Sequence, residues 1–219
     1  MSHPKYTLPT NSELGVELER RRFGQLDRTW SGPEFNRLLG KAMAENRDDF
    51  ILALYLGRHA GFRIHECFRI DTAAAERALR ENALTVKGKG DKVRIVPIED
   101  ERILMMLRKL LAQTERGHKL LVPDDVPTDR AINALELFIY RYRNEISDEG
   151  SDRRLTFHWL RHTFAVNCIR AEDDIKTVQS NLGHATAAFT LDVYGHFTDD
   201  MRSVSAQRME GFITNVLNL

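Results

Sequence analysis

The feature that most constrains the fold is a change of hydrophobic periodicity in residues 84–98, LTVKGKGDKVRIVPI. β-Branched residues lie on both sides of a Gly-rich turn there, which is the pattern of two short strands in a hairpin. Apolar residues before and after this segment recur at helical spacing instead. The sequence therefore predicts an α+β fold that is mainly α-helical and contains one small antiparallel β-sheet.

The predicted helices have recognisable start and stop signals. Ser31 and Glu34 have the spacing of a capping box, which starts a first helix. A second helix is expected over about 48–60, with Gly61 able to end it. Helical periodicity also covers 101–115, 128–146 and 156–171, and a further apolar stripe over 175–182 ends at Gly183. The segment 71–84 is helical in character as well.

Composition bounds the class of protein only loosely. An apolar content of 42% in 219 residues is enough for a core, and 32 basic residues balance 32 acidic ones. Net charge therefore does not indicate a nucleic-acid binder, and local clustering has to do so. Basic groups do cluster at 87–94, 141–143 and 153–154, and these are the surfaces that a bound nucleic acid such as DNA would face. Two cysteines, a polar N-terminus and no apolar run of membrane-spanning length predict a reduced, cytoplasmic protein without a membrane partner.

Residues 156–194 concentrate the side chains that suggest chemistry. His158 and Arg161 are three residues apart and share a helix face. His184 follows the helix-ending Gly183, and Tyr194 comes ten residues later. An arginine fork can hold phosphate oxygens bidentately, and a tyrosine can act as an oxygen nucleophile. This set suits a phosphodiester that is gripped and attacked.

Each of these residues also has an ordinary structural explanation. An arginine after a helix-ending glycine, such as Arg63, is usually a surface cation, and Tyr194 could be a core tyrosine. His158 and His162 are four apart, which invites a zinc site, but Trp159 stands where an HExxH hydrolase needs Glu. No metal is therefore predicted. A helix, a glycine and another short helix also resemble a helix-turn-helix reader of DNA.

Five motifs taken in order resemble the catalytic domain of the tyrosine recombinase, or phage integrase, family. The resemblance covers about residues 50–200. Its motifs are GFRIHE (61–66), VKGKGDKVRIVPI (86–98), HWLRH (158–162), LGH (182–184) and LDVYGH (191–196). Each motif alone is weak, but their order is specific, and the structural explanations do not predict it. The resemblance implies the tyrosine recombinase catalytic-domain fold.

The resemblance also implies a role for each matching residue. Arg63 and Arg161 would clamp the scissile phosphate, and Tyr194 would attack it to form a 3′-phosphotyrosyl link. Lys89 would protonate the leaving 5′-oxygen, with Lys87 as a rival for that role. His158 would assist proton movement and His184 would hydrogen-bond the phosphate. No metal or other cofactor is implied. His65 stands where the family usually has a small residue.

The predicted organisation has three parts: a polar extension over 1–30, the catalytic domain over 31–200 and an amphipathic helix over 201–219. Family members usually carry a separate core-binding domain, and too little chain precedes residue 31 to build it. We therefore expect weak, strongly salt-dependent binding of double-stranded DNA. The last helix could dock into a neighbouring protomer of a tetramer on DNA, or pack on its own domain.

The predicted function is site-specific recombination by DNA strand cleavage and rejoining, in integration or excision of a mobile element. One alternative is a type IB topoisomerase, which uses similar chemistry to relax supercoils. The other is a catalytically idle DNA-binding regulator.

Overall fold

The computed structural model describes residues 28–88, 93–148, 153–171 and 173–183. Its helices are α1 (Gly32–Ala44), α2 (Asp48–Ala60), α3 (Ile64–Cys67), α4 (Thr72–Glu81), α5 (Glu101–Leu111), α6 (Thr128–Ile146), α7 (Phe157–Arg170) and α8 (Ile175–Leu182). Strands β1 (Ala83–Lys87) and β2 (Val93–Pro97) pair antiparallel, with Ala83 opposite Pro97 and Lys87 opposite Val93. The predicted fold class is confirmed.

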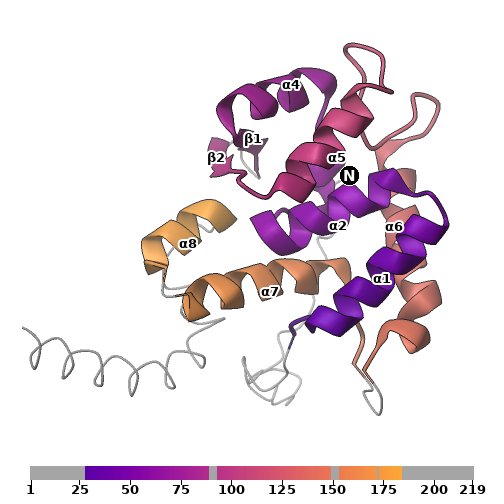
Figure 1. Cartoon of the computed structure of the whole chain (residues 1–219), viewed down its shortest axis with the longest axis vertical. Helices are drawn as coiled ribbons and strands as arrows, with labels where there is room; N and C mark the ends of the chain where they lie inside the picture. Colours follow the sequence, from indigo (N-terminus) through magenta and orange to yellow (C-terminus); the bar gives the residue numbers. More distant parts are fainter. Residues whose placement is uncertain (1–27, 89–92, 149–152, 172, 184–219) are drawn as a thin grey trace, which may run out of the picture.

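Helix α2 is the centre of the core (Figure 1). It packs against α1, α5 and α7, and its residues from Phe50 to Gly57 are all buried. A helix that is apolar all round is buried on all sides, as this one is. Gly57 lets α7 approach closely, because a Cβ there would lie 2.8 Å from Cζ of Phe157.

The ends of the helices follow the signals in the sequence. Ser31 Oγ accepts a hydrogen bond from Glu34 N (3.1 Å) and Ser31 N donates to the Glu34 carboxylate (2.9 Å), so the capping box that starts α1 is confirmed. Gly61 ends α2 in the left-handed region (φ 67°). The chain after it is extended at Arg63, so the helical pattern over 61–70 yields only the single turn of α3.

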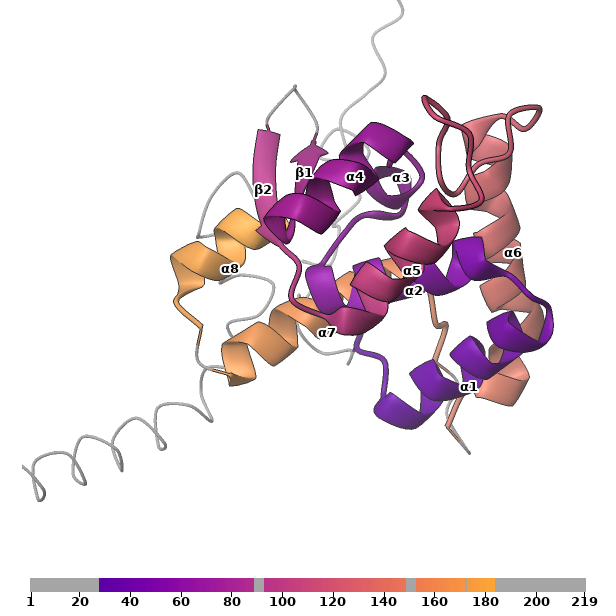
Figure 2. The same ribbon diagram turned by 45° about the horizontal axis from the view of Figure 1, so that its top comes forward.

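The hairpin and α8 lie side by side at one end of the molecule (Figure 2), and α8 contacts both β2 and α7. The segment 71–84, predicted to be helical, forms α4 up to Glu81 and enters β1 at Ala83, and α4 packs on β1 and α5. None of the helices in the described ranges is long and apolar enough to cross a membrane. The sheet end of the molecule thus brings together β2, α8 and the C-terminal end of α2.

Candidate functional site

Arg161 lies inside the fold and joins the ends of two other helices. Its residue is 2% exposed on α7. The guanidinium donates hydrogen bonds to the backbone oxygens of Gly61, which caps α2, and Leu182, the last residue of α8. Cations are favourable at helix C-termini, where carbonyl groups lack helical partners. The sequence placed Arg161 on the same helix face as His158, and the structure shows in addition that Arg161 is buried and connects α7 to the ends of α2 and α8.

Arg63 lies at the start of α3 with its guanidinium half open to solvent. Its side chain is 30% exposed, and Nη1 donates to Oε1 of Glu66 at 3.0 Å. The backbone nitrogen of Arg63 donates to Oε2 of the same carboxylate at 2.8 Å. One side of the guanidinium is thereby held by protein while the rest remains available to a ligand.

Glu66 is a site residue that the sequence analysis missed. It is 3% exposed and also accepts a bidentate pair of hydrogen bonds from Arg94, at 2.9 and 2.7 Å. Burial acts to raise the pKa of this carboxyl group, but hydrogen bonds from Arg94 and the Arg63 backbone, with the charges of both arginines, lower it to about 2. The sequence did contain a signal for Glu66. It lies three residues after Arg63, at the start of a helix, which is the spacing of a capping box.

Two histidines lie in the field of the same two arginines. Desolvation lowers the pKa of His158, although the ring keeps an exposed edge, and the charges of Arg161 and Arg63 lower it further. Desolvation also lowers the pKa of His65, Glu66 opposes this, and Arg69, Arg63 and Arg161 add to the lowering. A neutral imidazole can accept a proton, as general base catalysis requires. Arg161 binds the oxygen of Gly61, two residues before Arg63, and His158 lies one turn before Arg161 on α7, so the structure places the three side chains in one region.

Three predicted site residues, Lys89, His184 and Tyr194, lie outside the described residues, so their roles stay predictions. The structure does place the chain that leads to two of them. β1 ends at Lys87, two residues before Lys89, and Gly183 (φ 61°) directly precedes His184. Lys87 pairs with Val93, next to Arg94, which binds Glu66 beside Arg63. Gly183 follows Leu182, whose oxygen Arg161 binds.

The expected basic surface is only partly present. The prediction that Arg94 faces outward is wrong, since its side chain is 9% exposed and paired with Glu66. Arg153 pairs with the buried Glu34 at 2.9 Å, and Arg141 with Glu45 at 3.3 Å. These three guanidinium groups are thus engaged by carboxylates of the protein itself.

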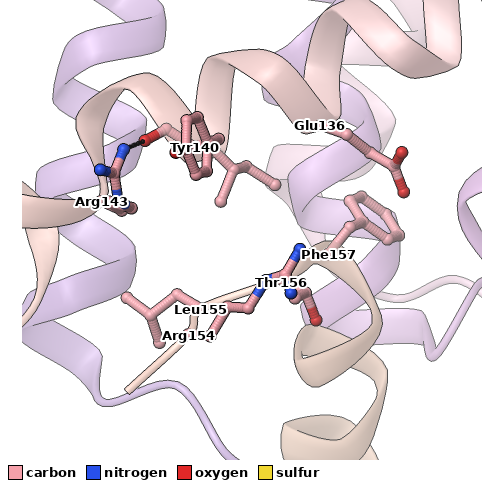
Figure 3. A pocket seen from close by; sticks show the side chains of 8 residues that line it. Glu136, Tyr140, Arg143, Arg154, Leu155, Thr156 and Phe157 are labelled. Carbon is pink, nitrogen blue, oxygen red and sulfur yellow. Dashed lines mark hydrogen bonds between the residues drawn. The ribbon is translucent and has the colours of Figure 1, made fainter. Parts of the chain in front are cut away.

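A pocket between α6 and the segment before α7 holds the two arginines that remain (Figure 3). Arg143 stacks over the ring of Tyr140, 3.9 Å from its centroid, and donates to the Tyr140 backbone oxygen at 2.8 Å. Arg154 lines the pocket beside Phe157, the first residue of α7. Neither arginine forms an ion pair with a carboxylate of the described ranges. Both can therefore receive an external anion.

Over the part of the chain that the structure describes, no three His, Cys, Asp or Glu side chains gather as metal ligands would. His158 and His162 stack edge to face, with ring centroids 4.7 Å apart.

Comparisons with known proteins show the family to which the chain belongs. Residues 34–201 match the model of the phage integrase family. The chain is 30% identical over 163 residues to tyrosine recombinase XerD of Pseudomonas putida, covering 72% of this chain and 52% of that protein. It is 32% identical over 165 residues to tyrosine recombinase XerC of Thermodesulfovibrio yellowstonii, covering 68% and 50%. The chain thus spans about half the length of the curated relatives it matches.

Solved structures show the same fold. XerA recombinase superposes with a TM-score of 0.62 at 25% identity, over 90% of this chain and 71% of that one. The catalytic domain of bacteriophage HP1 integrase superposes with a TM-score of 0.57 at 23% identity, over 81% of this chain and 93% of that one. Because the family model matches residues 34–201, which is more than half of this chain, the chain belongs to the phage integrase family.

Proposed function

We propose that this chain is a site-specific DNA strand transferase that works through a covalent phosphotyrosyl intermediate. The observation that carries the proposal is the joint placement of buried Arg161, half-open Arg63 and His158, which lies one turn before Arg161 on α7. Two fixed guanidinium groups suit the extra negative charge that gathers on a phosphate in its transition state. The family model extends through Tyr194, which supplies the nucleophile of the proposed reaction.

The proposed reaction uses side chains of this protein for every bond change and proton transfer, so it needs no cofactor. The Tyr194 oxygen bonds to phosphorus as the bond from phosphorus to the 5′-oxygen breaks. His158 assists removal of the phenolic proton, whose ordinary pKa is near 10. Lys89 gives a proton to the departing 5′-oxygen, and His184 hydrogen-bonds the phosphate. A 5′-hydroxyl of a second strand then reverses these steps and rejoins the DNA.

Double-stranded DNA is the proposed partner. Arg143 and Arg154, which pair with no carboxylate in the described ranges, are proposed to bind backbone phosphates beside the start of α7. Among the structural relatives, XerH recombinase is described bound to its difH substrate and the Tn1549 transposon integrase bound to transposon DNA. Both are below 25% identity and support the fold alone.

The test is covalent capture on nicked suicide DNA. A short duplex carrying a candidate site and a nick just 3′ of the cleaved phosphate loses the small fragment that bears the freed 5′-hydroxyl, so that rejoining cannot occur. A denaturing gel should then show a protein–DNA adduct. Tyr194→Phe should abolish the adduct. Tyr142→Phe is the matched control, because it removes a phenolic hydroxyl that binds Glu45 on the distant α6 surface. An adduct that survives in Tyr194→Phe rejects the proposal.

The finer proposal is that the recombined sites are the ends of a mobile element, as the integrase resemblance implies. A plasmid carrying two candidate junctions, taken from DNA that flanks the gene, should give a recombined product. Relaxation of a supercoiled plasmid without exchange between two sites would instead identify a topoisomerase-like activity.

We also propose a homo-oligomer, a tetramer on DNA, assembled through the apolar residues of the last segment. Met209, Phe212, Ile213 and Val216 recur there at helical spacing. Removal of residues 203–219 should abolish assembly on DNA in sedimentation velocity while single-strand cleavage stays measurable. Unchanged assembly would reject this proposal.

A further inference from the structure

Arg94 occupies the inward face of β2, where an apolar residue is expected. Val93 and Ile95 are 62% and 66% exposed, whereas the Arg94 side chain is 9% exposed and Val96 is buried. The strand thus turns two apolar side chains to solvent and a charge into the protein. Burying a guanidinium is costly unless it is paired and hydrogen-bonded. The orientation of β2 therefore depends on what Arg94 binds.

Arg94 binds two separate parts of the chain. Its two terminal nitrogens donate to the two oxygens of Glu66 at 2.9 and 2.7 Å, and Nε donates to the Asn181 backbone oxygen at 2.9 Å. The planar fork of arginine allows this bidentate geometry, which a lysine cannot reproduce. Gly183 leaves room for the side chain, because a Cβ there would lie 3.1 Å from Arg94 Cδ.

The Glu66 carboxylate is shared between Arg94 and Arg63. Oε1 accepts from Nη1 of Arg63 (3.0 Å) and from Nη1 of Arg94 (2.9 Å). Oε2 accepts from the Arg63 backbone nitrogen (2.8 Å) and from Nη2 of Arg94 (2.7 Å). Loss of the Arg94 fork would leave both hydrogen bonds from Arg63 to this carboxylate in place and would break the link from the carboxylate to the hairpin.

The end of α8 is held by two arginines from different elements. Arg94 binds the oxygen of Asn181, and Arg161 binds the oxygen of Leu182. Arg94 comes five residues after Lys89 on the same hairpin, and His184 is the second residue after Leu182. Arg94 thus lies where the hairpin, the carboxylate behind Arg63 and the end of α8 meet.

We propose that Arg94 is a positioning residue, which fixes the hairpin that carries Lys89 against Arg63 and the end of α8. This rests on the proposed function, in which Lys89 protonates the 5′-oxygen of the leaving strand. Arg94 does not touch DNA in this scheme. It acts by keeping the proton donor in reach of the leaving group.

The test compares two leaving groups. Cleavage is measured by single-turnover adduct formation on suicide DNA with an ordinary 5′-bridging oxygen, and on the same DNA with sulfur at that atom. A thiolate leaves without protonation, because thiols have a pKa near 8.5. The variant is Arg94→Lys, which keeps the charge and loses the fork. Its matched control is Arg47→Lys, since Arg47 also binds a carboxylate with two nitrogens (Asp49, 2.9 and 2.7 Å) but lies at the start of α2.

Arg94→Lys should slow cleavage of the oxygen substrate by about 10- to 100-fold, part of what general acid–base catalysis contributes. On the sulfur substrate the loss should shrink to within about threefold, and DNA affinity should stay unchanged, whereas a residue that only supports the fold would slow both substrates equally. Equal losses, or no loss, overturn the proposal. If Arg94→Lys does not fold, Arg94→Gln, whose amide can still donate to Glu66, replaces it and must show the same recovery on sulfur.

A second measurement separates this proposal from the function on which it rests. Hydrogen exchange in Arg94→Lys should quicken in both β2 and α8 and stay unchanged in α1. If the native chain forms no adduct on either DNA, the proposed function fails, and the exchange result still decides whether Arg94 ties the hairpin to α8. Unchanged exchange in β2 and α8 overturns that link.

Discussion

Two buried glutamates occupy the same local position in different parts of the molecule. Glu34 in α1 and Glu66 in α3 each follow the N-cap residue by three and accept its backbone N–H, at 2.9 and 2.8 Å. Each also binds an arginine distant in sequence, Arg153 for Glu34 and Arg94 for Glu66. The same capping geometry thus anchors a long-range ion pair at both places.

The two networks differ in the residue that is capped. At α1 the cap is Ser31, whose hydroxyl accepts a hydrogen bond from Glu34 N, as stabilising caps do. At α3 the cap is Arg63, whose guanidinium adds a second cation to the Glu66 carboxylate. The α3 network therefore carries more positive charge than its carboxylate neutralises. That excess, which a stabilising cap does not need, is what an anionic ligand would use.

The largest expected effect is on stability when the glutamates are neutralised. Glu66→Gln leaves two guanidinium groups without their buried anion and should cost about 3–5 kcal/mol of unfolding free energy. Glu34→Gln leaves one arginine, 28% exposed and able to reach water, and should cost about 1–3 kcal/mol. Urea denaturation measures both. Equal costs would show that the second arginine adds nothing.

The next effect is on catalysis and uses the arginines. Arg161→Lys should lower the rate of adduct formation on suicide DNA by about 10²-fold or more, by analogy with the loss of an oxyanion donor. Arg153→Lys alters the partner of the other glutamate and should leave that rate within about twofold. If Arg153→Lys lost as much rate as Arg161→Lys, the Glu34 network would contribute to catalysis and not only to stability.

Much of this fold follows from local signals. Gly61 and Gly183 both take positive φ at the ends of their helices, and Ser31 with Glu34 forms the expected capping box. The helix predicted over 128–146 has those bounds in α6. Each of these features depends on residues close together in sequence, so propensity and spacing are enough to predict them.

The Glu66 network could not be predicted in the same way. Arg94 and Glu66 are 28 residues apart, and strand alternation alone favours Val93, Ile95 and Pro97 as the buried face of β2. The opposite face is buried because Val96 joins the core and Arg94 finds Glu66 and the end of α8. Tertiary contacts therefore overrule the apolar pattern of the strand.

The pH dependence of stability should separate the two networks further. The pKa of Glu66 falls from 4.5 to about 2 on folding, so its contribution is complete above pH 4.5 and is lost as pH falls toward 2. The loss is about 3 kcal/mol, at about 1.4 kcal/mol per pH unit. Urea denaturation at pH 5, 4 and 3 should show about 2 kcal/mol of this loss in the native chain, because pH 3 is still above the folded pKa.

Glu66→Gln is the control for this titration, because it should lack the loss below pH 4.5. Both proteins share a separate loss at higher pH. Burial and the charge of Arg102 lower the pKa of His59 from 6.5 to about 4 on folding. The unfolded chain therefore binds this proton first, and the free energy of unfolding falls as pH drops from 6.5 to 4. Identical curves below pH 4.5 would contradict the assignment to Glu66.

The smallest expected effect concerns arginines outside both networks. Arg143→Ala and Arg154→Ala should each weaken DNA binding uniformly across sequences and reduce the slope of log K against log salt by about 0.9. The reason is that each removes a cation that no carboxylate of the described ranges neutralises. Arg141→Ala is the matched control, since Arg141 is a neighbour on α6 already paired with Glu45. Fluorescence anisotropy at several salt concentrations measures the slopes, and an equal change in all three variants would place the DNA elsewhere than beside the pocket at the start of α7.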